Sequence, residues 1–187
     1  DITGSGASPL VCGDLLAQTY ARAFHLPVVI VRSGNVYGEG DLHWDRLIPG
    51  TIRSALFGKP PLLRSNGLLK RDCIYAGDIV RAYLKVLFAA LQGKLPAGAA
   101  INLGAVRSHT VLEVTRLILN AVGQPDLAPH IDDHARHEIP EQHVNYEFAK
   151  TLLGWEPLVD LEHGLRKTVD WYTRFLKLED ECTREPV

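Results

Sequence analysis

Methionine does not occur anywhere in the 187 residues of this sequence. A translated chain begins with methionine, and its removal normally requires a small second residue, whereas position 1 here is an aspartate. We therefore expect that Asp1 is not the natural start of the protein and that a portion lies upstream.

Cysteine is also scarce. Cys12, Cys73 and Cys182 are far apart, odd in number and without the spacing of metal ligands, which predicts reduced thiols in a cytoplasmic protein.

Apolar runs long enough to cross a membrane are lacking, and no signal peptide is expected. The 20 basic and 22 acidic residues are scattered and give a net charge of −2, so we expect neither nucleic acid nor a membrane as partner.

The first part of the chain predicts a helix followed by a buried strand. Residues 10–24 carry apolar side chains at helical spacing, and Tyr20 falls on this apolar face, which predicts a core position. The β-branched run 28–31 follows a proline and is typical of a buried strand in a parallel sheet. A helix followed closely by such a strand indicates an α/β layered domain.

The remaining chain alternates helices with short strand-like pieces. Asn66-Gly67, a strong tight-turn pair, separates two such pieces. Thr110 and Glu113 form a capping-box pattern at the start of a helix that Gly123 ends. An amphipathic helix is predicted over 78–91, with an apolar stripe formed by Ile79, Tyr83, Leu84, Leu87, Phe88 and Leu91. Further helices are predicted over 44–57, 145–153 and 160–176, and a strand within 98–104.

Two stretches could bind a ligand. The loop 32–46 leaves the carboxyl end of a predicted strand, where α/β sheets bind ligands, so Asn35, Tyr37 and Arg46 are candidate contacts; a glycine-rich surface loop is the alternative. In the stretch 70–78, the fork of Arg71 suits a phosphate or a carboxylate. The alternative there is a structural ion pair of Arg71 with one of the aspartates of the same stretch, Asp72 or Asp78.

A third stretch, 130–138, gathers histidines and aspartates, but their spacing fits no usual zinc site. We expect a solvated loop without metal, in which Arg136 is a possible second anion contact.

Four short motifs follow one another along the chain: R-x-x-N-V-Y-G at 32–38, R-D-x-[IL]-Y-V-x-D at 71–78 with Ala76 in place of Val, N-L-G at 102–104, and A-x-x-x-L-G-W-x-P at 149–157. Together they resemble the C-terminal portion of the extended short-chain dehydrogenase/reductases, the NAD-dependent nucleotide-sugar epimerases and dehydratases. Within that family, residues 34–84 are most similar to the 4,6-dehydratases that act on CDP-glucose.

The resemblance implies an α/β fold: the C-terminal part of a Rossmann-type parallel sheet with a smaller mixed α/β substrate-binding lobe. We expect residues 1–43 to end the Rossmann-type domain and residues 44–187 to form mainly the substrate lobe, with some segments returning to the first domain. A homodimer, formed through a helix bundle that includes the first helix, is implied for a full-length parent.

The resemblance also implies the site. The substrate would be a nucleotide sugar, with CDP-glucose the specific expectation, and Asp78 would cap its helix and orient its neighbours instead of touching substrate. The implied contacts are Asn35, Arg46 and Arg71 to the pyrophosphate, Leu63 and Arg64 to the base, Asn102 near the same pocket, and Arg136 or Glu141 where the C-terminal lobe closes over the nucleotide.

The sequence departs from the family where the chemistry is done. The family's Tyr-x-x-x-Lys pair falls on Gly6 and Leu10 in one register and on Ser5 and Pro9 in the other, and the glycine-rich cradle for NAD is missing. We expect NAD in the full-length family enzyme but no NAD binding and no dehydratase activity in this chain alone. Three interpretations remain open: a truncated 4,6-dehydratase, an inactive relative that binds nucleotide sugar or is structural, and an epimerase of the same family.

Overall fold

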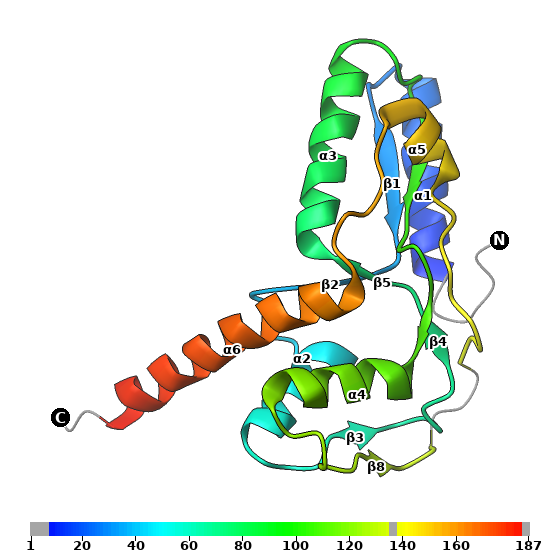
Figure 1. Cartoon of the computed structure of the whole chain (residues 1–187). Coiled ribbons are helices and arrows are strands. Elements are labelled where there is room, and N and C mark those ends of the chain that lie inside the picture. The colour runs from blue at the N-terminus through cyan, green and yellow to red at the C-terminus, as the bar shows by residue number, and fades with distance from the viewer. Residues whose placement is uncertain (1–7, 135–137, 185–187) are drawn as a thin grey trace.

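The structure is a computed structural model that describes residues 8–134 and 138–184. Ser5, Gly6 and Arg136 therefore lie outside the described residues, while Pro9 and Leu10 belong to the first helix, α1 (Ser8–Ala23). The described chain forms two lobes, which Figure 1 shows one above the other. None of the helices in these ranges is both long enough and apolar enough to cross a membrane.

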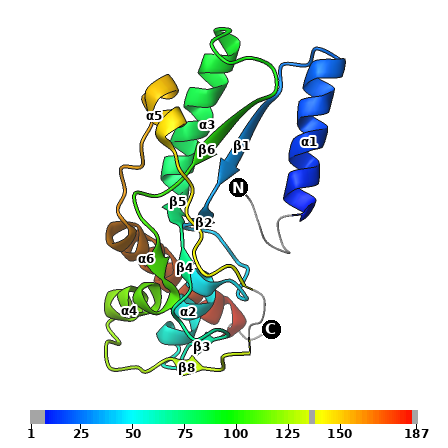
Figure 2. The ribbon, with the colours of Figure 1, turned by 90° about the vertical axis from the view of Figure 1, so that its right-hand side faces the viewer.

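The upper lobe is a small parallel α/β layer. Strands β1 (Val29–Ser33) and β6 (Ala99–Leu103) pair in parallel along their full lengths. Helices α1 and α3 (Ala76–Leu91) lie on opposite sides of the strands, as Figure 2 shows, and α5 (Glu147–Leu153) contacts β6. This is the parallel α/β arrangement that the helix and the β-branched run predict.

The lower lobe is mainly helical. Helix α4 (Val111–Val122) packs against both α2 (Leu47–Leu56) and α6 (Leu161–Arg184). Strands β3 (Leu62–Leu63) and β8 (His130–Ile131) form a short parallel pair at its edge. The lobe therefore assembles from chain segments that are widely separated in sequence.

Short strand pairs join the lobes. Strand β2 (Asn35–Tyr37) pairs in parallel with β5 (Cys73–Tyr75), and β4 (Lys70–Arg71) pairs antiparallel with β7 (His109–Thr110). The hairpin implied by Asn66-Gly67 is therefore wrong: Gly67 does turn the chain, with φ of 81°, but the flanking pieces β3 and β4 pair with β8 and β7 instead of with each other.

Strand β5 contributes to two separate cores. Because successive side chains of a strand point to opposite faces, Cys73 enters the core of the lower lobe and Ile74 enters that of the upper lobe. The lower core also contains Tyr37, Ile52, Ile118, Leu165 and Tyr172, and the upper core contains Ala82, Val86, Ile101, Leu103 and Trp155.

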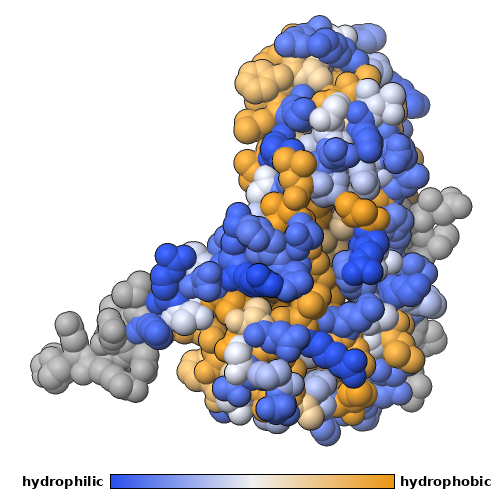
Figure 3. All heavy atoms as spheres, viewed as in Figure 1, coloured by the Kyte–Doolittle hydropathy of each residue, from blue (hydrophilic) through white to orange (hydrophobic). Residues whose placement is uncertain are grey.

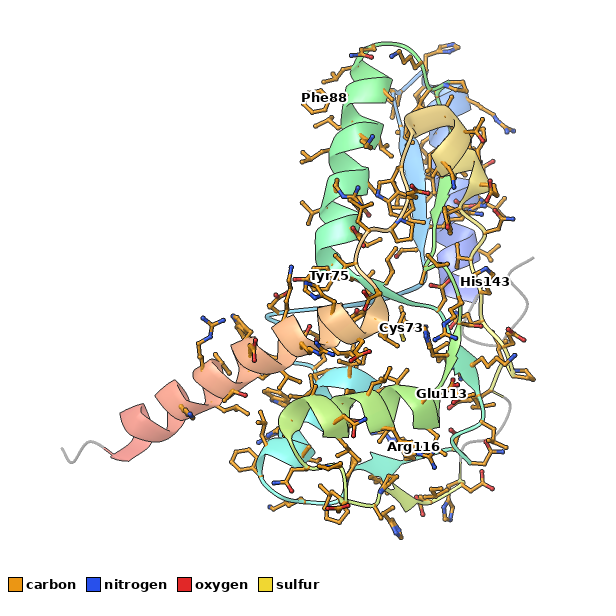
Figure 4. The ribbon with its side chains drawn as sticks, viewed as in Figure 1. Cys73, Tyr75, Phe88, Glu113, Arg116 and His143 are labelled. Carbon is orange, nitrogen blue, oxygen red and sulfur yellow. The ribbon has the colours of Figure 1, made fainter. Side chains whose placement is uncertain are left out.

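Two predicted core faces point to solvent. In α3 the members of the predicted stripe other than Ile79 are at least half exposed, and Figure 4 shows Phe88 directed away from β1. The helix instead packs through Ala82, Val86 and Ala89, whose modest size lets it approach the strands closely. Tyr20 of α1 is 48% exposed, so its predicted core position is wrong as well. Figure 3 shows apolar surface along the α3 edge of the upper lobe.

Candidate functional site

A cavity of about 760 Å³ is lined by strand β2 and by the α2 and β3 segments of the lower lobe. Its walls come from the loop after β1, the start of α2, the β3 segment, β4 and Glu138. We call this space the anion cavity. Five of the predicted contacts line it: Asn35, Arg46, Leu63, Arg64 and Arg71. These five residues are spread over 37 positions of the sequence, from Asn35 to Arg71, and the fold brings them to one cavity.

Arg71 is the most enclosed cation of the anion cavity. Only 17% of its side chain is exposed. One terminal nitrogen donates to the backbone carbonyls of Lys70 (2.9 Å) and Ile139 (2.8 Å), and the other donates to the carboxylate of Glu138. The structural alternative raised by the sequence, a pair with Asp72 or Asp78, is not formed; the partner is Glu138, 67 positions away.

Glu138 is a cavity residue that sequence reasoning missed. It lines the cavity and holds the guanidinium fork that an anionic ligand would otherwise bind. Because the two residues meet only through the fold, spacing along the chain gives no signal of the pair. An incoming phosphate must compete with this carboxylate for Arg71.

Arg46 and Arg64 also have carboxylate partners. Arg46 donates to Asp41 at 3.0 Å, and Arg64 donates to Asp45 at 3.3 Å. Both arginine side chains are more than 60% exposed, so these pairs contribute little to stability and can exchange for a ligand. The cavity is thus lined by three arginines, each paired with an acidic residue that also lines it.

The start of α2 adds backbone donors to the same wall. Arg46 occupies the N-cap position, where it makes no side-chain capping bond, and the first turn contains no acidic residue. Leu47 and Ile48 line the cavity, and their N–H groups are among those that a helix leaves without intrahelical partners. A helix N-terminus of this kind attracts an anion. The sequence signal for it was present, since no Ser, Thr, Asp or Asn stands at position 46.

The other predicted contacts lie elsewhere or outside the described part. Glu141 does not line the cavity; it binds Lys70 at 3.3 Å and Ser108 at 3.0 Å, and these partners lower the pKa of its carboxyl. Asn102 is partly buried on β6, also away from the cavity, and its amide oxygen has no hydrogen-bond partner within the described residues. Arg136 falls outside those residues.

Asp78 and Tyr37 have structural contacts. Tyr75, not Asp78, is the N-cap of α3, so the predicted cap is wrong. The buried Asp78 carboxylate instead accepts the N–H groups of Leu158 (3.1 Å) and Val159 (3.0 Å), which orients the segment leading to α6. Tyr37 lines the cavity, but its hydroxyl donates to the Leu161 carbonyl at 3.3 Å, and burial raises the pKa of that hydroxyl far above its ordinary value.

The described residues do not form the pyrophosphate cradle of NAD. That cradle requires a strand that turns through glycines into a helix with an open N-terminus. Strand β1 leads into β2 instead, and β6 is followed by β7 and then by α4, whose first turn is closed by the capping box of Thr110 and Glu113. Figure 4 shows Glu113 at that end of α4. Nor do His, Cys, Asp or Glu side chains gather in threes for a metal within the part of the chain that the structure describes.

The fold is an α/β arrangement of the Rossmann type, and its candidate ligand site lies beside the short parallel pair of β2 and β5. Residues 11–104 match the NAD dependent epimerase/dehydratase family. The chain belongs to this family.

Similar proteins include both dehydratases and epimerases. The dTDP-glucose 4,6-dehydratase of Haemophilus influenzae is 33% identical over 170 residues, which cover 84% of this chain and 48% of that protein. Among solved structures, dTDP-glucose 4,6-dehydratase from Bacillus anthracis in complex with NAD has a TM-score of 0.81 and 28% identity, covering 92% of this chain and 53% of that one.

A UDP-glucose 4-epimerase from Thermotoga maritima, solved with UDP-glucose, has a TM-score of 0.79 and 26% identity, covering 89% of this chain and 52% of that one. The chain spans about half the length, or less, of the curated relatives it matches.

Proposed function

We propose that this chain is the nucleotide-sugar-binding portion of an NAD-dependent sugar-nucleotide 4,6-dehydratase, with CDP-glucose as its substrate. The family membership and the dehydratase relatives support the reaction class. CDP-glucose is proposed from the resemblance of residues 34–84, while the relatives named above act on dTDP-glucose or UDP-glucose according to their names.

The observation that carries the proposal is the wall shared by Arg71 and the α2 N-terminus. Arg71 offers a largely enclosed guanidinium, and α2 offers uncapped N–H groups beside Arg46. A diphosphate has two anionic groups, so it can use both at once, and two anchors fix the attached sugar in one orientation. The exposed Arg64 and the buried Leu63 line the same cavity, and in this proposal they contact the base.

In this proposal the chain binds and orients substrate but does not perform the hydride chemistry. NAD would supply the hydride acceptor in the full-length enzyme, and the described residues of this chain do not form its cradle. An epimerase of the same family remains a second candidate, because the solved relatives include an epimerase at nearly the same TM-score. A catalytically inactive binding relative is the third.

Titration calorimetry with CDP-glucose, dTDP-glucose and UDP-glucose tests the binding. We expect saturable 1:1 binding with CDP-glucose the tightest, and a loss of at least about tenfold in Arg71→Ala, since a charge-assisted pair contributes roughly 1.5–3 kcal/mol. Arg116→Ala changes an exposed arginine of α4 that does not line the cavity and serves as the matched control. Equal affinity in both variants, or no binding of any of the three sugars, would refute the proposal; tighter binding of dTDP-glucose would refute only the CDP assignment.

Activity is tested separately with the 187-residue chain, NAD and CDP-glucose. We expect no 4-keto-6-deoxy sugar. Formation of that product would show that the chain carries its own cofactor site and general base, contrary to the proposal.

A further inference from the structure

A second cavity, of about 450 Å³, lies between the lobes against the other side of Cys73. Strand β5, the loop 105–109, α4 and the segment leading into α6 form its walls. We call it the seam cavity. Cys73 lines both cavities. Figure 4 places Cys73 at the seam above α4, and Figure 3 shows apolar surface in the hollow between the lobes.

The seam cavity contains a buried polar group that the fold leaves unpaired. His109 is 9% exposed, and its ring nitrogen Nδ1 has no hydrogen-bond partner within the described residues. Leaving such a group unpaired destabilises the folded state, so an unpaired buried group in a native protein calls for a physical reason. Burial and the nearby Arg107 guanidinium both lower the pKa of the imidazole. A neutral ring offers one donor and one acceptor to a ligand.

Arg107 supplies a cation at the same cavity. It is exposed, and no hydrogen bond or ion pair joins its guanidinium to another described residue. The acidic residues of the lining are already engaged: Asp160 accepts the N–H of His163 at 2.8 Å, and Glu162 pairs with Arg166. Arg107 is therefore the available charge, whereas the cations of the anion cavity each have an acidic partner.

The lining selects among anions. Ile74, Val106, Leu117 and Leu161 give the cavity largely apolar walls, which suit the body of an organic molecule and not a bare inorganic ion. Asp160 and Glu162 at the α6 side repel a multiply charged anion. A single carboxylate on an apolar body satisfies Arg107 and the walls together, and its second oxygen can accept the N–H of the neutral His109 ring.

We propose that the seam cavity is a binding site for a small organic monocarboxylate with an apolar body, held by Arg107 and His109. The site is distinct from the anion cavity and does not depend on the nucleotide-sugar assignment. The two cavities are nevertheless close together, because His109 of the seam cavity and Arg71 of the anion cavity are direct partners in the β4–β7 pair.

The probe for the test is 3-phenylpropionate, titrated into the 187-residue chain and followed by calorimetry and by backbone amide shifts. We expect saturable 1:1 binding, with the largest shifts in residues 105–109. Arg107→Gln should weaken it at least about tenfold, since the charge-assisted bonds are lost. Arg116→Gln, on the exposed face of α4, is the matched control.

Two further measurements separate this site from its neighbour. Arg46→Gln alters the anion cavity at an exposed position and should leave 3-phenylpropionate binding unchanged. Inorganic phosphate should not displace the probe. The proposal is overturned if no saturable binding occurs, if Arg107→Gln and Arg116→Gln behave alike, or if Arg46→Gln rather than Arg107→Gln removes binding.

Discussion

The backbone N–H of Val144 donates a hydrogen bond of 2.7 Å to the Asp72 carboxylate, across 72 positions of sequence. The other carboxylate oxygen accepts the N–H of Ala105 at 2.8 Å. Asp72 is completely buried, and burial raises its pKa while the two backbone bonds oppose the rise. Figure 4 labels His143, which precedes Val144 and whose ring lies 3.5 Å from the same carboxylate. One side chain thus ties the position next to Arg71 to the segment that follows β6 and to the segment that precedes α5.

Replacement of Asp72 by alanine should destabilise the chain strongly. The substitution leaves two backbone N–H groups without an acceptor, at about 1–3 kcal/mol each, so we expect a loss of roughly 2–5 kcal/mol in the free energy of unfolding. Urea unfolding measures it. Asp170→Ala, at an exposed position of α6, should stay within about 0.5 kcal/mol. If the two variants lose equal stability, Asp72 does not hold the segments at Ala105 and Val144 in place.

Two glycine substitutions should change stability in opposite directions. A Cβ on Gly104 would overlap the carbonyl oxygen of Val144 and lie 3.0 Å from the Asp72 carboxylate, so Gly104→Ala must push the segment at Val144 away. A Cβ on Gly13, inside α1, meets no atom within 4 Å, so Gly13→Ala should stabilise by about 0.5–1 kcal/mol through helix propensity. Thermal unfolding of both variants checks the signs, and stabilisation by Gly104→Ala would contradict the close approach.

Glu138→Gln should strengthen nucleotide binding. The carboxylate of Glu138 occupies the Arg71 fork, and its neutral replacement competes less with a phosphate. We expect nucleoside diphosphates to bind about 2- to 5-fold more tightly, the range that a partly exposed charge pair allows. Calorimetry with CDP measures the change. Glu156→Gln, which removes a surface pair with Lys150, is the control. A weaker affinity for CDP in Glu138→Gln would mean that Glu138 positions Arg71 for the ligand instead of competing with it.

Local signals in the sequence predicted their structures well. The capping box of Thr110 and Glu113 forms as expected, with both reciprocal bonds present, and Gly123 ends that helix in the left-handed conformation, with φ of 81°. Each of these signals depends on residues within one helical turn of one another. The helices over 78–91 and 160–176 also occur, as α3 and the greater part of α6.

Contacts between distant segments could not be predicted in the same way. Spacing shows that Tyr83, Leu87 and their neighbours share a face of α3, but not that Ala82 and Ala89 provide the face that packs on the strands. Similarly, motif matches brought Asn35, Arg46 and Arg71 to one cavity, whereas the Glu138 partner of Arg71 and the position of Asn102 away from the cavity depend on the fold alone.

His109 should make the stability of the chain depend on pH in the mildly acidic range. Its folded pKa lies below the ordinary value near 6.5, because burial and then Arg107 disfavour the charged ring, while Glu113 and Asp72 act weakly in the opposite direction. The unfolded chain therefore binds the proton more readily, so the stabilisation is complete above pH 6.5 and is lost as the pH falls through the lowered pKa. Between pH 7.5 and 5.5 we therefore expect the free energy of unfolding to fall, by no more than about 1.4 kcal/mol per pH unit from this group. Urea unfolding at both pH values is compared between the native sequence and His109→Gln. The variant should lose less free energy of unfolding between the two pH values, whatever its absolute stability, and the difference is the contribution of His109.

His163→Gln is the control. It replaces an exposed histidine at the start of α6 and should show the same change of stability with pH as the native sequence. An unchanged slope in His109→Gln would show that the imidazole titrates alike in the folded and unfolded chains.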